Sequence, residues 1–380
     1  MSANISYNQL IKLARQCGFV AVGSLSISKI NRKNLQTQFK SILSDNPKSL
    51  VVLFHPYPKL NKCTKFYDYP EEIKLAYFAQ IFDYHRIVKQ RISELAGTLL
   101  QKPYYNKAWW GVDDHPLPEK ELAQQAKIGF KGKNKLLILP EYGSFGSLGI
   151  LVSPLKIKKD KIEDKSRFKS SVSTEEYCKN CRKCINNCPV SALKINEKLN
   201  TDKCISALTQ KQGRLSWELV ANIENHFWGC DICQLVCPYN NDKNYATQKK
   251  FEDVDLLKYG WPEIGDLTVK EILLLHKKDM PRGWDGFVFN WLGKRILIRN
   301  MLIVLGNNRT PIYWDIIKNI SNHPSSVLRY YAYYCLYRWH WQENKKRATE
   351  FLKKKAFQET DKINEQILYK TAGSKEEFIK

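Results

Sequence analysis

The sequence predicts an α+β protein that continues into an all-helical C-terminal part. Three observations predict this: short apolar runs typical of buried strands in the first 155 residues, eight of the eleven cysteines between residues 178 and 237, and helical patterning from about residue 250 onward. A chain of 380 residues is long enough for two or three domains. We expect three parts, with the ranges 1–165, 166–245 and 246–380.

In the first part, Ser49–Phe54 is short, rich in valine and leucine and followed closely by a proline, which predicts a buried strand. Leu136–Leu139 and Leu148–Val152 predict two more strands around a glycine-rich turn. Apolar residues at helical spacing predict one long amphipathic helix over Glu71–Leu100. The polar segment that begins at Lys156 predicts a linker.

The last part consists of helical patterns interrupted by Gly, Asn and Pro. Lys294–Leu305 predicts a helix that ends at Gly306, and Thr310-Pro311 can cap the next one. Another helix is expected to start at Ser325. Short helix pairs of this kind predict a HEAT-like repeat region.

The strongest signal is a bacterial ferredoxin run for a [4Fe–4S] cluster, Cys-x2-Cys-x2-Cys-x3-Cys-Pro, which spans Cys178–Pro189. A second run, Cys-x2-Cys-x3-Cys-Pro, spans Cys230–Pro238 and lacks one cysteine, which Cys204 can supply. In this motif the cysteine before proline ligates the other cluster. The sequence therefore predicts a ferredoxin-like module with two clusters, one on Cys178, Cys181, Cys184 and Cys237, the other on Cys188, Cys204, Cys230 and Cys233.

Two zinc sites are the alternative for these cysteines. Zinc ligand pairs are usually separated by a longer loop than these runs provide, and both runs end in Cys-Pro. The remaining residues Cys17, Cys63 and Cys335 are scattered, and we interpret them as small buried apolar residues.

The formal net charge of +23 predicts a polyanionic partner, either nucleic acid or an anionic membrane surface. No segment approaches the ~20 apolar residues of a transmembrane helix, and the N-terminus has no signal-peptide core. We therefore expect a cytoplasmic protein without a membrane partner, in which thiols stay reduced and the cysteines serve a purpose other than disulfides.

Further ordered motifs lie between about residues 49 and 340. They are Asp83-Tyr84-His85, Val112–Lys120, Ala126–Asn134, Glu141–Ser144, Cys204–Gly213, Gly229–Gln234 and Trp291–Asn300. Together with the cysteine runs, these motifs resemble the epoxyqueuosine reductase family, cobalamin-dependent enzymes of tRNA wobble-base maturation. The sequence departs from the family pattern at Ala79–Phe82 and at Asp114-His115.

The resemblance implies that the first part binds cobalamin, that two [4Fe–4S] clusters pass electrons to its cobalt, and that the protein reduces epoxyqueuosine to queuosine in tRNA. This is the last step of queuosine biosynthesis, a two-electron reduction with loss of water. The family register implies that Asp113 donates the proton and that cobalamin is contacted by Asp113, Lys133, Asn134, Leu137, Ser144, Leu148, Ser206 and Gln210. The implied partners of the expected monomer are the tRNA anticodon stem-loop and an external electron donor such as flavodoxin or ferredoxin.

Each of these interpretations has an alternative. Asp113 can equally be a loop residue or a helix N-cap, Asp114 is a rival donor, and the glycines Gly132 and Gly143 can serve tight turns instead of a flat cofactor. The alternative functions are a reductive dehalogenase-like reductase of a small molecule and a non-catalytic iron–sulfur electron carrier.

The C-terminal part combines basic and aromatic residues, which can hold RNA phosphates and stack on bases. We interpret most of the aromatic residues as helix-packing core and keep the cations as a group for tRNA binding. The cations are Lys294, Arg295, Arg299, Arg329, Arg338, Lys345, Lys346 and Arg347, and the aromatic residues are Tyr330, Tyr331, Tyr333, Tyr334, Trp339 and Trp341.

Overall fold

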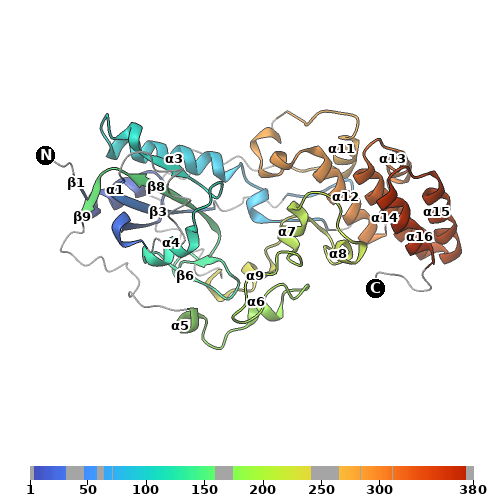
Figure 1. Cartoon of the computed structure of the whole chain (residues 1–380), viewed down its shortest axis with the longest axis horizontal. Coiled ribbons are helices and arrows are strands. Elements are labelled where there is room, and N and C mark those ends of the chain that lie inside the picture. The colour runs from blue at the N-terminus through green and yellow to red at the C-terminus, as the bar shows by residue number, and fades with distance from the viewer. Residues whose placement is uncertain are drawn as a thin grey trace.

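The computed structural model describes residues 4–30, 47–57, 64–70, 72–158, 174–240, 265–282, 284–309 and 311–373. A sheet-containing part lies at one end of an elongated molecule and a stack of helices at the other, with the cysteine-bearing segments between them (Figure 1). The predicted boundaries near 165 and 245, most of the predicted linker, Cys63 and Thr310 lie outside the described residues.

Four antiparallel strands form the sheet of the first part, in the order β2-β3-β8-β5. They are β2 (Ala21–Ser26), β3 (Ser49–Pro56), β8 (Gly146–Ser153) and β5 (Trp109–Gly111). The strands predicted over 49–54 and 148–152 are therefore confirmed, as β3 and β8. The third, β7 (Leu137–Ile138), pairs with β6 (Phe130–Lys131) in a separate hairpin.

Helices cover both faces of this sheet. Alternate residues of β3 face opposite sides: Val51 and Leu53 pack with α1 (Tyr7–Gln16) and α3 (Tyr84–Leu99), whereas Leu50, Val52 and Phe54 pack with α4 (Glu119–Gln125). Since both faces are buried, β3 is apolar without interruption from Leu50 to Phe54, and this made it recognisable in the sequence.

The predicted helix over 71–100 is wrong in its first third. The helix α3 begins at Tyr84, and Asp83 is its N-cap, with a carboxylate that accepts from the backbone N–H of His85 at 2.9 Å. The motif Asp83-Tyr84-His85 thus opens a helix. Before it, β4 (Lys74–Leu75) pairs in parallel with β10 (His226–Trp228), and apolar spacing alone could not reveal this distant partner.

The segment 64–82 crosses from the first part to the C-terminal part. Phe66 forms a β-bridge with Leu267, and Phe82 forms one with Phe287. The first residues of the predicted linker form a strand instead of a loop, because β9 (Lys156–Lys158) pairs in parallel with β1 (Asn4–Ser6). The chain therefore ties its parts together by pairings that are remote in sequence.

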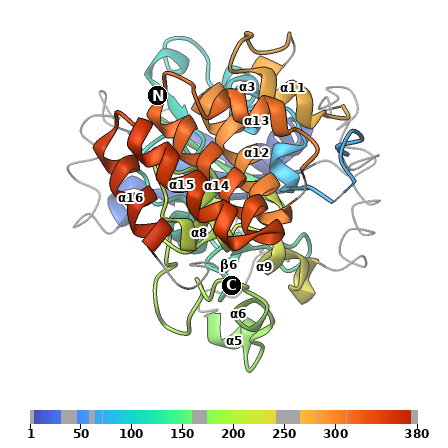
Figure 2. The same cartoon turned by 90° about the vertical axis from the view of Figure 1, so that its right-hand side faces the viewer.

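The helical end is seen face-on in Figure 2, where consecutive helices lie side by side. The helix α12 runs two residues beyond the predicted stop at Gly306, to Asn308, and its C-cap Arg309 has a left-handed φ of 55°. The N-cap position of the next helix is Tyr313 instead of Thr310-Pro311, and that of α14 is Ser325 as expected, although neither side chain forms a capping hydrogen bond. The helices are α11 (Val269–Leu274), α12 (Lys294–Asn308), α13 (Trp314–Ile320), α14 (Ser326–Glu343), α15 (Lys345–Gln358) and α16 (Lys362–Gly373).

The aromatic residues of α14 form the core of this end, as interpreted from the sequence. Tyr330, Tyr331, Tyr333 and Tyr334 are each at most 3% exposed, and Cys335 is also buried. Among the described residues, no helix is both long and apolar enough to cross a membrane.

Candidate functional site

The first predicted cluster set lines one cavity of about 170 Å³. Its thiols come from α5 (Thr174–Cys178), the loop after it, α6 (Lys183–Asn186) and the residue before η5 (Pro238–Asn240). The structure thus brings together Cys178, Cys181, Cys184 and Cys237, the grouping that the ferredoxin spacing predicts.

The second set lines a larger cavity of about 380 Å³. Cys204 is the N-cap of α7 (Ile205–Gln210), and Cys233 lies in α9 (Ile232–Leu235). With Cys188 and Cys230, these residues form the second predicted grouping. Because α6 packs against α9, the two cysteine sites are neighbours.

Two of these thiols, Cys184 and Cys230, favour the protonated form when no cation is near. Burial and the neighbouring thiols of its set raise the pKa of Cys184 to about 11, and burial raises that of Cys230 to about 12. A bound iron cluster would supply the positive charge that thiolates require. Among the described residues, no group of three or more His, Cys, Asp or Glu side chains is arranged to hold a single metal ion.

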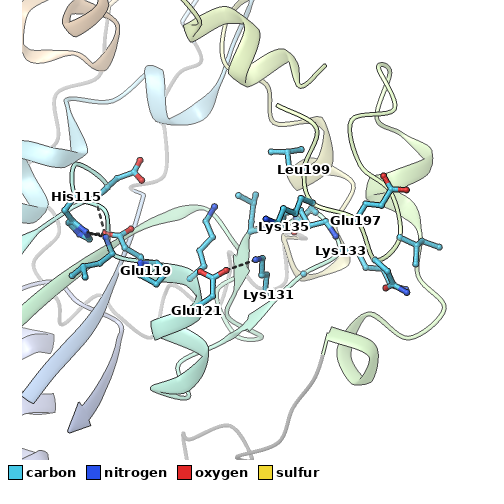
Figure 3. Close-up of a pocket in the computed structure, with 18 residues that line it drawn as sticks. His115, Glu119, Glu121, Lys131, Lys133, Lys135, Glu197 and Leu199 are labelled. Carbon is cyan, nitrogen blue, oxygen red and sulfur yellow. Dashed lines mark hydrogen bonds and ion pairs between the residues drawn. The ribbon is translucent and has the colours of Figure 1, made fainter. Parts of the chain in front are cut away.

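Asp113 lines a third cavity, of about 600 Å³, which extends from its loop to the segment 195–199 (Figure 3). Its backbone has a left-handed φ of 54°, and its N–H donates to Glu119 at 3.0 Å. The Tyr84 hydroxyl donates to Asp113 Oδ2 at 3.1 Å. Glu119 also pairs with His115 at 3.0 Å. The loop around Asp113 is therefore held by Tyr84 on α3 and by Glu119 on α4.

The rival donor Asp114 does not line this cavity. It pairs with Lys89 on α3 and accepts from the backbone N–H of Val112 at 3.2 Å. Burial would raise the pKa of Asp114, but these partners outweigh it and leave the pKa below its ordinary value. A carboxyl held ionised by a lysine is a poor proton donor, which favours Asp113 over Asp114.

The cavity of Asp113 adjoins the second cysteine site. Asn134, Leu136 and Leu199 line both cavities. Asn134 is 4% exposed, and its Nδ2 has no hydrogen-bond partner among the described residues. A buried amide without a partner at the junction of two cavities is a candidate ligand contact.

The other predicted cofactor contacts divide into two groups. Ser206, Gln210 and Ser144 line the second cysteine cavity, although the Ser144 hydroxyl already donates to Gln234 at 2.8 Å. Lys133 lines the cavity of Asp113. In contrast, Leu137 and Leu148 belong to the apolar core beside the sheet and line none of these three cavities.

Gly132 and Gly143 stand where neighbouring residues leave no room for a side chain. Gly143 has a φ of 74°, and a side chain there would collide with Asn240. A side chain at Gly132 would collide with Ile138 and Asn134. The tight-turn alternative therefore accounts for both glycines without a cofactor.

Two residues of this site were not predicted from the sequence. Tyr57 and Asp231 line the second cysteine cavity, and burial raises the pKa of both. Asp231 accepts from the backbone N–H of Tyr77 at 2.6 Å and from Gln234 at 2.8 Å. Asp231 lies within the motif Gly229–Gln234, but Tyr57 carries no local signal and reaches the site because β3 ends there.

The helix α7 is held in place by α12. Arg299 is fully buried and donates to the carbonyls of Leu208, Thr209 and Lys211 at the C-terminal end of α7, where a cation is favourable. Asn300 donates to the carbonyls of Thr209 and Phe227, each at 2.9 Å. Two residues of the C-terminal part thus position the helix that carries Cys204, Ser206 and Gln210.

This geometry corrects the interpretation of the basic tail. Arg299 and Arg338 are buried, and Arg329 is paired with Glu359, so these three cations are not available to RNA phosphates. Arg295, Lys345, Lys346 and Arg347 are exposed. Sequence periodicity could not separate the two groups, because a buried arginine and an exposed one look alike.

Comparison with known proteins agrees with this arrangement. A family described as the 4Fe-4S double cluster binding domain matches residues 177–240. The epoxyqueuosine reductase of Lactococcus garvieae is 31% identical over 299 residues, covering 77% of this chain and 80% of the relative. That of Listeria monocytogenes is 27% identical over 300 residues, covering 77% and 73%.

Solved structures of epoxyqueuosine reductases share the fold. A selenomethionine-labelled one superimposes with a TM-score of 0.73 at 22% identity, covering 96% of this chain and 97% of the other. Another, bound to an epoxyqueuosine-modified tRNA stem loop, gives 0.70 at 21% identity with the same coverage. Since a relative at 31% identity is matched over four fifths of its length, this chain belongs to the epoxyqueuosine reductase family.

Proposed function

We propose that this protein reduces epoxyqueuosine to queuosine at the wobble position of tRNA, in a cobalamin-dependent reaction that takes up two electrons and releases water. The observation that carries the proposal is the adjacency of the second cysteine site to the cavity of Asp113. Membership in the epoxyqueuosine reductase family supports the choice of substrate.

The two cysteine sets would hold two [4Fe–4S] clusters as electron carriers. The ligands are Cys178, Cys181, Cys184 and Cys237 for one cluster, and Cys188, Cys204, Cys230 and Cys233 for the other. The match to a double-cluster domain over residues 177–240 supports both sites.

Cobalamin would bind at the junction between the second cysteine site and the cavity of Asp113. The unpartnered Nδ2 of Asn134 would contact it, together with Lys133, Ser144, Ser206 and Gln210. When bound, cobalamin supplies a low-potential cobalt centre that an amino-acid side chain cannot provide. The predicted contacts Leu137 and Leu148 would support this pocket from the core behind it.

Asp113 would protonate the epoxide oxygen, which otherwise leaves as an unstable anion. The Tyr84 hydroxyl would hold the carboxyl in a fixed orientation through its hydrogen bond to Oδ2. The His115–Glu119 pair would fix the far side of the same loop. The residues of this chain would thus supply an acid that lines the cavity and is held in one orientation.

The tRNA side of the site would lie beside α3. Trp291 is 55% exposed and packs edge-on against His85, with ring centroids 4.9 Å apart. His85 in turn stacks on Tyr84, the partner of Asp113. An exposed indole so close to the proposed acid is suited to stack on an unpaired anticodon base, and the exposed Arg295 nearby to hold a phosphate.

The test is a single-turnover assay on anaerobically reconstituted protein with cobalamin, a reductant and tRNA carrying epoxyqueuosine. The tRNA is digested to nucleosides, and the mass of the wobble nucleoside is measured by mass spectrometry. Loss of one oxygen that requires cobalamin and disappears in Asp113→Asn supports the proposal, with Asp114→Asn as the matched control that keeps activity. An unchanged nucleoside, from protein that holds cobalt and both clusters, would contradict the substrate and leave the small-molecule reductase as the alternative.

A further inference from the structure

We propose that an acidic one-electron carrier protein docks on the exposed cations around the first cysteine site and delivers electrons there. The docking face consists of Lys179, Arg182 and Lys183, and we call it the entry face. The inference rests on the two-cluster part of the proposed function and is independent of the tRNA substrate.

The entry face carries positive charge that no ion pair compensates within the described residues. No Asp or Glu occurs between Cys178 and Asn196, whereas Lys179, Arg182 and Lys183 all occur within the first cysteine run. All three side chains are exposed, and none forms an ion pair with a carboxylate in the described part of the chain. In contrast, Lys131 and Lys211 pair with acids at 2.8 and 2.9 Å.

The loop that presents these cations is held from the first part of the chain. The ammonium group of Lys133 donates to the carbonyls of Lys179 at 2.5 Å and Cys181 at 3.0 Å. Lys179 itself has a left-handed φ of 37°, a conformation that these contacts maintain. The entry face is therefore preformed, which lowers the entropic cost of docking.

The order of the two sites gives the direction of electron flow. Both sites share lining residues with the cavity of Asp113, the first Lys133 and Asn134 and the second Asn134, Leu136 and Leu199. Only the second site is also lined by Tyr57, Ser206 and Gln210, so we assign it to the reaction side. The first site bears the exposed cations and contacts the second through α6 and α9. The three cations of the entry face do not line the cavity of Asp113, so a carrier bound to them approaches the first site.

Each encounter transfers one electron and no atoms. The reduced carrier is oxidised by one electron, and the oxidised cluster at the first site is reduced by one. Two encounters supply the two electrons that the proposed reduction requires. A carrier with an acidic surface is favoured because opposite charges steer the encounter and raise its rate.

RNA is also a polyanion, but the position of the entry face favours the carrier. The entry face lies on the segment of α5 and α6, at the lower edge of the view in Figure 1. The residues proposed for tRNA contact belong to a different segment: Trp291 lies just before α12, and Arg295 lies in its first turn. The same experiment measures tRNA binding, so that RNA docking on the entry face would be detected.

The test compares Lys179→Gln/Arg182→Gln with Lys346→Gln/Arg347→Gln, which removes the same charge from exposed positions on α15. Lys183 is left unchanged because it also lines the cluster cavity. Cluster-loaded full-length protein is mixed with reduced flavodoxin, and cluster bleaching is followed by stopped flow across a range of salt concentrations. Dithionite reduction and tRNA binding are measured on the same samples.

We expect the entry-face variant to be reduced by flavodoxin about tenfold more slowly at low salt, with a flatter salt dependence. Its reduction by dithionite and its tRNA affinity should be unchanged, and the α15 variant should match the wild type with flavodoxin. Equal flavodoxin rates in all three proteins would overturn the proposal. So would a loss of tRNA affinity in the entry-face variant without a change in its flavodoxin rate.

Discussion

The orientation of the Asp113 carboxyl depends on one hydroxyl group. Burial raises the pKa of Tyr84 above its ordinary value, with Tyr57 and Asp113 adding to the effect, so the phenol remains a hydrogen-bond donor at any physiological pH. Its bond to Asp113 joins α3 to the loop after β5, two elements 29 residues apart. Tyr84 is therefore a positioning residue for the proposed acid.

We expect Tyr84→Phe to lower kcat/KM for epoxyqueuosine reduction by about 2- to 10-fold. A neutral hydrogen bond contributes about 0.5–1.5 kcal/mol, and each 1.36 kcal/mol changes a rate about tenfold. The measurement is the nucleoside assay under single-turnover conditions. Tyr105→Phe is the control, because it removes a bond of 2.9 Å to Ser93 elsewhere on α3, and an equal loss in both variants would mean that only the helix was disturbed.

At the scale of elements, α12 packs within the helical C-terminal part and also stabilises the segments that carry the cysteines. Arg299 and Asn300 satisfy the carbonyls at the end of α7, and Thr209 of α7 accepts on its hydroxyl from the backbone N–H of Gly229, next to Cys230. This network fixes the relative positions of the segments that carry Cys204 and Cys230. The second cysteine site thus depends on a helix that contributes no thiol to it.

We expect Arg299→Lys and Asn300→Asp to lose iron selectively from the second site, lowering the iron content by about half. Arg299→Lys removes donors to the carbonyls of Leu208, Thr209 and Lys211, and Asn300→Asp removes the donor to the carbonyl of Phe227 beside the second site. A buried carbonyl left without a donor costs about 1–3 kcal/mol. Iron analysis and electron paramagnetic resonance of the reduced protein measure the effect. Arg329→Lys, which weakens a pair within the helical end, should keep both clusters, and full iron in all three variants would contradict the prediction.

A second element-scale prediction concerns the pair of Arg329 on α14 and Glu359 after α15. Burial alone would raise the pKa of Glu359, but hydrogen bonds from Arg329, Tyr333, Asn364 and the backbone of Asp361 lower it from 4.5 to about 2. A carboxylate with a depressed pKa stabilises the folded state above its unfolded pKa and loses this contribution as the pH falls.

Glu359→Gln should therefore be less stable than the wild type at neutral pH. The difference in free energy of unfolding should shrink as the pH falls from about 4.5 toward 2. Urea unfolding of the metal-free chain, followed by circular dichroism at several pH values, measures this. A difference that stays constant over this range would show that the pair does not titrate as described.

At the scale of the whole molecule, the cations behind the net charge of +23 have different roles. Arg299, Arg338 and Arg329 serve the interior or internal pairs, whereas Arg295 and the cations of α15 remain exposed. Phosphate contacts release counterions from RNA, so affinity depends on the number of exposed cations that reach it.

We expect the affinity for the tRNA to fall steeply with salt, with a log–log slope of about −3 if the four exposed cations each contact a phosphate. Arg295→Gln should weaken binding and flatten the slope, whereas Arg338→Gln should affect stability more than the slope. Fluorescence anisotropy with a labelled anticodon stem-loop between low and physiological salt measures both. A flat salt response of the wild type would contradict a binding surface built on these cations.

The sequence by itself determined the features that depend on local spacing. The two cysteine runs, with Cys204 as the missing member, led to the groupings that line the two cavities, because the cysteine before proline in each ferredoxin run belongs to the other cluster. The strand β3 was identified from its uninterrupted apolar run Leu50–Phe54, which is typical of a strand buried on both faces. The motif around Asp113 was recognisable as a resemblance.

The tertiary structure decided what depends on partners distant in the chain. It made the predicted helix begin at Tyr84 instead of Glu71, because β4 pairs with β10, and it buried Arg299 against the carbonyls of α7. It also brought Tyr57 and Asp231 into the second cysteine cavity and placed Leu137 and Leu148 in the core. Helical periodicity and residue type are the same for a solvated face and for one that packs on another segment, so only the packing itself could distinguish them.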